Sequence, residues 1–221
     1  MFRYTFQWRS AFAALPSMLS GAVVTMQIAI LSMIIGLVAG IVLTLGRTSK
    51  NKLFYSFATS WVELARNTPA LFQIYMTYFG LGSFSIQLGS YLSLLLGISF
   101  NNAGYLAETF RGGLRAVPLT QTRAARSLGM SAPQAFRLIV WPQLLRVTFY
   151  PIMNQMVWAV LMTSLGVVVG LNTDLTGVTQ EFNVRTFRTF EFFTLAAVIY
   201  YLITKAITLT ARLGAWRLFR Y

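Results

Sequence analysis

Residues 10–46 read SAFAALPSMLSGAVVTMQIAILSMIIGLVAGIVLTLG and contain no charged side chain. A transmembrane helix needs about 20 consecutive, mostly apolar residues, so this stretch is long enough to cross a membrane. Two further stretches, residues 67–107 and 147–173, are also free of charge. The sequence therefore predicts an all-α integral membrane protein.

The composition of the whole chain supports this prediction and excludes several kinds of chemistry. Of 221 residues, 56% are hydrophobic and 10% are charged, against about 25% charged residues in soluble domains. Cysteine and histidine are absent, which excludes thiolate chemistry, Ser-His-Asp catalysis and histidine-ligated metals. The five acidic residues are scattered along the sequence, so we expect no metal site.

Five transmembrane segments fit one domain over residues 1–221. We expect them at about residues 19–45, 57–80, 91–110, 147–171 and 192–211. Polar residues and Pro69 interrupt the second segment, and Gly80, Gly82, Gly89 and Ser90 mark the turn that follows it. Residues 1–17 place Phe2, Phe6, Trp8 and Phe12 among polar residues, which is typical of an interfacial segment.

The distribution of Lys and Arg predicts the orientation of the segments. Twelve of the 18 basic residues lie after the first and third segments and in the C-terminal tail (Arg47, Lys50, Lys52, Arg111, Arg115, Arg123, Arg126, Arg137, Arg146, Arg212, Arg217, Arg220). Four lie on the opposite side (Arg3, Arg9, Arg185, Arg188). Because basic residues collect in the cytoplasm, we expect the N-terminus outside and the C-terminus inside. The net charge of +13 also suggests a nucleic-acid partner, but charges placed between membrane segments disfavour one.

Residues 112–146 are too polar to cross lipid and predict a helix, a break and a second helix. Pro118 suits the first turn of a helix, and Gly129 can adopt the left-handed conformation that ends one. Ser131 and Gln134 have the spacing of a capping box, and Pro142 is expected to end the second helix. From spacing alone, this hairpin is either a docking element or a solvated connection.

Specific motifs in this segment resemble a known family. Residues 123–129 (RAARSLG) followed by residues 139–142 (IVWP) resemble the EAA loop of ABC-importer permeases. The chain as a whole resembles the polar amino acid permeases of bacterial binding-protein-dependent importers. Further matching stretches are Gly21-x-x-Val24-Thr25, Val62-Glu63-Leu64-x-Arg66-x-Thr68-Pro69, residues 103–113, Pro142-Gln143-x-x-Arg146, Thr163-Ser164-Leu165, Arg185-Thr186-Phe187-Arg188 and Phe190-Glu191.

The resemblance implies a permease subunit of the bacterial inner membrane that is not itself an enzyme. It implies a second permease chain, two cytoplasmic ATP-binding subunits and an extracytoplasmic solute-binding protein as partners. A phosphate-binding G-x-x-x-x-G-K-[ST] loop is absent from the sequence, so ATP and Mg²⁺ are expected on the ATPase and no cofactor on this chain. The expected ATPase-coupling residues are Arg123, Ala124, Ala125, Ser127, Leu128, Gly129 and Met130.

Three departures from the family pattern bear on the function. Arg123 replaces the first Glu of the EAA motif, and Trp141 replaces a Leu. Leu161 and Met162 stand where the family often has Lys-Asp before Thr-Ser-Leu. The absence of these charges leaves open the alternative that this chain is the half of a permease pair that lacks the substrate site.

The solute path is expected where polar side chains lie within apolar segments, because such groups usually face the interior of a bundle. The candidates are Arg66, Asn67, Thr68, Asn101, Asn102, Asn154, Thr163 and Ser164. Arg66 can bind a substrate carboxylate with its planar guanidinium, or it can pair with Glu63 one turn earlier. Asn101 and Asn102 can instead form hydrogen bonds between helices.

Other features have structural as well as functional interpretations. Glu108 and Arg111 are three residues apart and can pair on one helix face, so we interpret them as gate or structural residues. The pairs Gly36/Gly40 and Gly166/Gly170 are expected to allow close packing of helices. A membrane scaffold or assembly subunit without a conduction path is the alternative function, and the buried polar clusters argue against it.

Overall fold

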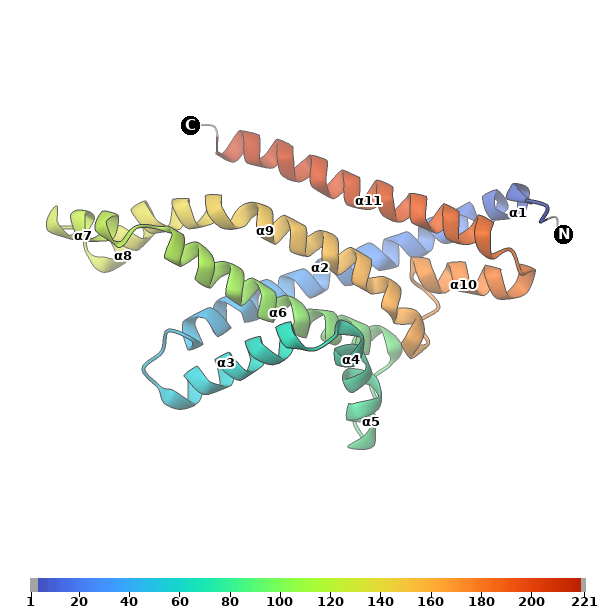
Figure 1. The fold of residues 1–221 in the computed structure, drawn as a ribbon, viewed down its shortest axis with the longest axis horizontal. Helices are drawn as coiled ribbons and strands as arrows, with labels where there is room; N and C mark the ends of the chain where they lie inside the picture. The colour runs from blue at the N-terminus through green and yellow to red at the C-terminus, as the bar shows by residue number, and fades with distance from the viewer. Residues whose placement is uncertain (1–3, 220–221) are drawn as a thin grey trace.

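The computed structural model describes residues 4–219, and every regular element within this range is helical. Figure 1 shows long helices that lie side by side, with the N-terminus and the C-terminus toward opposite ends of the long axis. The predicted all-α fold is therefore confirmed. Arg3 and Arg220, used in predicting the orientation, lie outside the described residues.

The N-terminal region contains a short helix, α1 (Trp8–Ala13), followed by the long helix α2 (Leu15–Gly46). The predicted interfacial segment 1–17 was too long, because α2 already begins at Leu15. Pro16 lies in the first turn of α2, where its missing N–H leaves no helical hydrogen bond unmade. The uncharged stretch that follows forms one helix of 32 residues.

The second predicted segment is divided into several short elements. Helix α3 (Lys52–Asn67) ends before Pro69, and α4 (Ala70–Tyr75) follows it. A π-helical turn η1 (Met76–Gly80) and the short helix α5 (Leu81–Ser83) complete the region. In Figure 1, α4 and α5 turn away from the direction of α3.

Helix α6 (Ser90–Ala116) is the central element and contacts α2, α3, α4 and α9. It continues past residue 110, so the first residues of the predicted loop 112–146 are helical. The predicted close packing at Gly36/Gly40 is present between α2 and α6. A Cβ added to Gly36 would lie 2.5 Å from the Cβ of Asn102, and one added to Gly40 would lie 3.0 Å from the Cβ of Leu106.

The predicted hairpin is present as α7 (Leu119–Ser127) and α8 (Ala132–Ala135), but the second helix does not end before Pro142. A π-helical segment η2 (Phe136–Val140) leads into α9 (Trp141–Met162) and the 3-10 helix η3 (Thr163–Val169). Together they form one helix of 38 residues, Ala132–Val169. The wider π turn changes the backbone pairing just before Pro142, which explains why this proline does not stop the helix.

Helix α10 (Leu175–Thr186) was not anticipated from the sequence, and α11 (Thr189–Leu218) completes the fold. The carboxylate of Asp174 caps α10 by accepting hydrogen bonds from the N–H groups of Thr176 (3.2 Å) and Gly177 (3.1 Å). Gly170 has φ +76° and ends η3. The predicted close packing is present at Gly166, where an added Cβ would lie 2.7 Å from Leu94 Cδ2 of α6, but not at Gly170, where the nearest atom is Ser90 Oγ at 3.9 Å.

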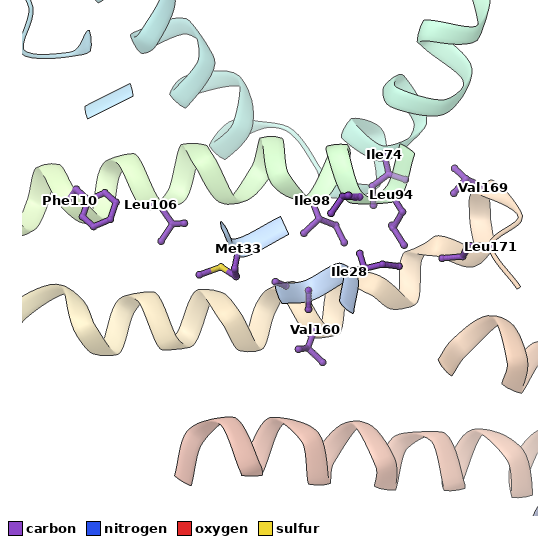
Figure 2. Close-up of a cluster of buried hydrophobic side chains, with 13 residues drawn as sticks. Ile28, Met33, Ile74, Leu94, Ile98, Leu106, Phe110, Val160, Val169 and Leu171 are labelled. Atoms are coloured by element: carbon purple, nitrogen blue, oxygen red, sulfur yellow. The ribbon is translucent and has the colours of Figure 1, made fainter. Parts of the chain in front are cut away.

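The largest hydrophobic core lies where α2, α4, α6 and α9 meet (Figure 2). Ile28 and Met33 of α2 contribute to this core, together with Ile98 and Leu106 of α6 and Val160 of α9. Burial of large aliphatic side chains between helices fixes their relative positions. This packing sets the framework around the polar groups described below.

Three helices in the described part of the chain are long and apolar enough to cross a membrane, namely Leu15–Gly46, Ala132–Val169 and Thr189–Leu218. They contain the first and fifth predicted segments and residues 147–169 of the fourth, which was predicted to end at residue 171. The other two predicted segments correspond to the broken α3–α4 region and to α6, which has Glu108, Arg111 and Arg115 near its C-terminal end.

Candidate functional site

A cavity of about 600 Å³ lies beside the break between α3 and α4. Its polar lining includes Thr68, Asn101, Asn154 and Gln155, and the ring of Tyr105 forms part of the wall. The other lining residues are Pro69, Ala70, Leu71, Pro151, Trp158, Met162 and Leu165. Three of the eight predicted path residues, Thr68, Asn101 and Asn154, therefore meet in one cavity.

The break at Pro69 is stabilised by two amide side chains. Proline has no N–H, so the carbonyl of Ala65, four residues earlier, loses its helical donor. Gln73 Nε2 donates to the Ala65 carbonyl at 2.9 Å, and Asn101 Nδ2 donates to it at 3.2 Å. Gln73 Nε2 also lies 2.9 Å from Thr68 Oγ1. Sequence reasoning missed Gln73, although a glutamine inside an apolar stretch was an available signal.

Asn101 and Asn102 point to different neighbours. The Nδ2 group of Asn101 also donates to Gln73 Oε1 at 3.0 Å. Asn102 donates to Ser32 Oγ at 3.3 Å and accepts from Gln155 Nε2 at 2.9 Å. Asn102 thus joins α2, α6 and α9, which is the interhelical hydrogen bonding weighed as one of its two roles.

Three other predicted path residues do not line the cavity. Asn67 donates to Glu63 Oε2 at 2.8 Å. Thr163 Oγ1 donates to the carbonyl of Val160 at 2.8 Å, and Ser164 Oγ donates to that of Leu161 at 2.7 Å. These short-range bonds satisfy the hydroxyl groups within their own helix.

A cluster of three arginines surrounds Glu108 near the C-terminal end of α6. Glu108 Oε2 lies 2.7 Å from Arg47 Nη1 and 2.9 Å from Arg111 Nε. Arg111 Nη2 makes a further contact with Glu108 Oε1. Arg66 Nη1 lies 3.8 Å from Glu108 Oε2. The predicted contact between Glu108 and Arg111 is present, and Arg47 and Arg66 join it from α2 and α3.

The alternative pairing of Arg66 with Glu63 was wrong. The Glu63 carboxylate accepts from Asn67, and Arg66 reaches α6 instead. The Arg66 guanidinium lies over the ring of Tyr105, with its carbon 5.9 Å from the ring centroid. Arg66 therefore lies next to a wall of the cavity, although it is not among the lining residues.

Two of the three local features that the sequence predicted for the hairpin at residues 118–135 are present. Gly129 has φ +86°, a left-handed conformation that favours glycine. Ser131 and Gln134 form the capping box, with Gln134 Oε1 accepting from the Ser131 N–H at 2.7 Å. Pro118, expected within the first turn, is instead the residue that caps α7.

The predicted coupling residues differ in exposure. Leu128 is 81% exposed, and Arg123, Ala124 and Ser127 are exposed on α7. Ala125 is buried within the hairpin itself. A second cavity of about 440 Å³ opens on this face and is lined by Ala124, Ala125, Leu128 and Met130 among others. Ala124 and Leu128 are therefore exposed on this face, and Ala125 is buried in the wall of this cavity.

The fold and these sites define a class of protein, an integral membrane protein that combines a polar cavity with a protruding helical hairpin. Residues 32–213 match the family described as the binding-protein-dependent transport system inner membrane component. The chain belongs to this family, whose members are permease subunits of ABC transporters and not enzymes themselves. The predicted family resemblance is thus confirmed.

Two similar proteins are permeases of a nopaline and a glutamine transport system. The chain is 31% identical over 211 residues to the nopaline transport system permease protein NocM of Agrobacterium fabrum, covering 91% of this chain and 87% of the relative. It is 29% identical over 209 residues to the glutamine transport system permease protein GlnP of Escherichia coli, covering 94% and 95%.

Solved structures show the same architecture. A crystal structure of an amino acid ABC transporter with histidines matches with a TM-score of 0.90 and 28% identity, covering 97% of this chain and 100% of that chain. An inward-facing structure of the MetNI methionine ABC transporter matches with a TM-score of 0.64 and 18% identity, covering 90% and 94%. The second similarity concerns the fold alone.

Proposed function

We propose that this chain is a permease subunit of a bacterial ABC importer for a polar amino acid. Its proposed partners are a second permease chain, two cytoplasmic ATP-binding subunits and an extracytoplasmic solute-binding protein. The similarity to GlnP over 94% of the chain supports the solute class. ATP and Mg²⁺ would be bound by the ATPase, and this chain would hold no cofactor or metal.

We further propose that one domain, residues 1–221, crosses the inner membrane five times, with the N-terminus outside and the C-terminus inside. In this arrangement α2, α3–α4, α6, α9–η3 and α11 are the transmembrane segments. The loop of residues 112–146, including α7, then lies in the cytoplasm with Arg47, Lys50 and Lys52. This distribution agrees with the collection of basic residues on the cytoplasmic side.

The cavity beside Pro69 is the proposed solute path, and it is the observation that supports transport over a scaffold role. Thr68, Asn101, Asn154 and Gln155 bring amide and hydroxyl groups to a cavity that is otherwise lined mainly by apolar side chains. Such groups are costly in lipid and usually serve a path or a site. Broken helices often form binding sites in transporters. Arg66 completes the set at the edge of the cavity. Asn102 joins the surrounding helices, and Asn67, Thr163 and Ser164 bond within their own helices.

The proposed contact with the ATPase is the exposed face of α7 and the turn after it. Ala124 and Leu128 present a small and a large apolar side chain, with Arg123 beside them. Ser127, Gly129 and Met130 set the shape of the turn. Ala125 stabilises the hairpin from inside and would affect coupling indirectly.

ATP-dependent uptake in proteoliposomes tests the function. The permease is reconstituted with its ATPase, its solute-binding protein and any second permease from neighbouring genes. We expect uptake of at least one polar amino acid, and we expect Ala124→Arg to retain ATP hydrolysis but lose uptake. A complex that hydrolyses ATP but moves no amino acid would refute the proposal. Met162 lines the cavity at a position where the family often has a charged residue. If uptake depends only on the cavity of the second permease chain, this chain is the permease half without a substrate site.

Cysteine labelling tests the orientation, because the chain has no native cysteine. Leu128→Cys and Phe187→Cys form a matched pair, since the native side chains are 81% and 84% exposed. In intact cells, a membrane-impermeant maleimide should label Cys at position 187 and should label position 128 only after permeabilisation. The reverse pattern would overturn the proposed topology.

A further inference from the structure

The Glu108 cluster contains more positive than negative charge. One carboxylate faces the guanidinium groups of Arg47, Arg66 and Arg111, all within 4.0 Å of its oxygens. A carboxylate has two oxygens and accepts bidentate pairing from one arginine especially well. Arg111 contacts both oxygens of Glu108. The cluster therefore has guanidinium donors left over for another anion.

Arg66 is the member of the cluster with the weakest hold on Glu108. Its Nη1–Oε2 distance of 3.8 Å is too long for a hydrogen bond, whereas Arg47 makes one at 2.7 Å. The Arg66 side chain is 39% exposed, against 16% for Arg47 and 25% for Arg111. Arg66 can thus leave Glu108 at the smallest cost in buried surface and hydrogen bonds.

The position of Arg66 connects the cluster to the cavity. Its guanidinium lies over Tyr105, and Tyr105 lines the cavity. Thr68, two residues after Arg66, lines the same cavity and belongs to the break in the helix. A small rotation of the Arg66 side chain across the Tyr105 ring would bring its donors to the cavity while keeping a cation–π contact.

We propose that Arg66 exchanges between Glu108 and the carboxylate of a solute at the cytoplasmic edge of the cavity. This inference rests on the proposed transport function and adds a specificity for carboxylate-bearing solutes. Glu108 acts as an internal competitor of the solute, so it weakens binding and promotes release toward the cytoplasm. Arg47 and Arg111 keep Glu108 in place while Arg66 is away.

The two partners of this exchange should have opposite effects on affinity. Glu108→Gln removes the competing charge and should raise the affinity of the permease for an amino acid. Arg66→Gln removes the donor for the carboxylate and should lower that affinity. A purely structural ion pair would predict the same direction for both, because either change would break the same contact.

Equilibrium binding to the purified complex, without nucleotide or solute-binding protein, tests the exchange. The probes are the radiolabelled polar standard amino acids, with the corresponding carboxamides as competitors. Since hydrogen bonds to charged groups contribute about 1.5–3 kcal/mol, the wild type should prefer the amino acid over its amide by about tenfold or more. Arg66→Gln should reduce this preference to about twofold or less, and Glu108→Gln should strengthen amino acid binding about threefold or more without affecting the amide.

Matched controls keep the outcomes distinct. Arg185→Gln breaks the exposed Glu181–Arg185 ion pair elsewhere in the chain and should leave the preference unchanged. Arg66→Lys keeps the charge without the planar fork and should give an intermediate preference. If Arg66→Gln keeps the full preference in a complex that transports, the exchange is wrong and the proposed function stands. If the wild type neither binds nor transports any of these amino acids, the proposed function fails and the exchange fails with it.

Discussion

The hydrogen bonds at the Ala65 carbonyl predict a specific non-additivity between Gln73 and Asn101. Both side chains donate to this buried carbonyl, which Pro69 leaves without a helical donor. Gln73→Met or Asn101→Leu alone removes one donor and keeps the other. The double variant removes both and leaves a buried carbonyl without a partner.

The expected magnitudes follow from the bonds lost. Hydrogen bonds between membrane helices contribute about 0.6 kcal/mol each on average, so each single variant should lower the free energy of unfolding by about 1–2 kcal/mol. An unsatisfied buried polar group costs a further 1–3 kcal/mol or so. Either single variant also removes the bond from Asn101 Nδ2 to Gln73 Oε1, so the sum of the single variants counts this bond twice. The double variant should therefore exceed that sum by about 0.5–2 kcal/mol.

Unfolding of the purified permease in mixed micelles with increasing SDS measures these free energies. Gln87→Met makes the same change in the exposed loop before α6 and should be close to neutral. Additive effects within about 0.5 kcal/mol, as for independent sites, would refute the shared role of the Ala65 carbonyl.

Three further predictions concern packing, pH and backbone conformation. Gly36→Ala should destabilise the α2–α6 contact by about 1–3 kcal/mol in a thermal unfolding assay, because its Cβ would lie 2.5 Å from that of Asn102. Gly112→Ala is the control and should be neutral in this assay, because its Cβ meets nothing within 4 Å. Burial raises the pKa of Asp174 from 3.8 to about 6, so the folded state binds the proton more tightly than the unfolded state. The contribution of Asp174 to the free energy of unfolding therefore falls by about 3 kcal/mol as the pH rises from about 4 to above 6. Asp174→Asn keeps an N-cap side chain and should show a flatter thermal stability profile between pH 4 and 7; an unchanged slope would contradict the assignment. Gly129→Ala should cost about 1–2 kcal/mol at its left-handed φ of +86°, lowering coupled uptake more than basal ATP hydrolysis; equal uptake would count against a shaped turn.

Local sequence signals predicted much of the fold because they act over a few residues. The capping box at Ser131 and Gln134 depends on a spacing of three residues, and Gly129 ends a helix through its own backbone freedom. The uncharged stretch of residues 10–46 required only that one long apolar helix form. These features were predicted correctly for that reason.

Other features depend on contacts that the sequence order does not reveal. Arg66 had a carboxylate three residues away at Glu63, yet it reaches Glu108, 42 residues later, because α3 packs against α6. The continuation of the helix through Pro142 depends on the π-helical turn before it, which local proline preferences do not indicate. Helix α10 had a sequence signal in the N-cap residue Asp174, but the residues that follow carry no clear apolar periodicity that would have indicated a helix.

The continuous helix Ala132–Val169 determines how a change of chain length near the hairpin affects the orientation of side chains further along. At 1.5 Å per residue, its 38 residues form a rod of about 57 Å, beginning at the hairpin cap and passing Asn154 and Trp158 at the cavity. Each residue advances an α-helix by about 100°, so deleting one residue from its α-helical part between Trp141 and Arg146 would rotate every later side chain by that angle. The wider π turn Phe136–Val140 can instead absorb a deletion by narrowing to an α turn. The π turn thus allows a change of one residue near the hairpin without changing which face of the rod lines the cavity.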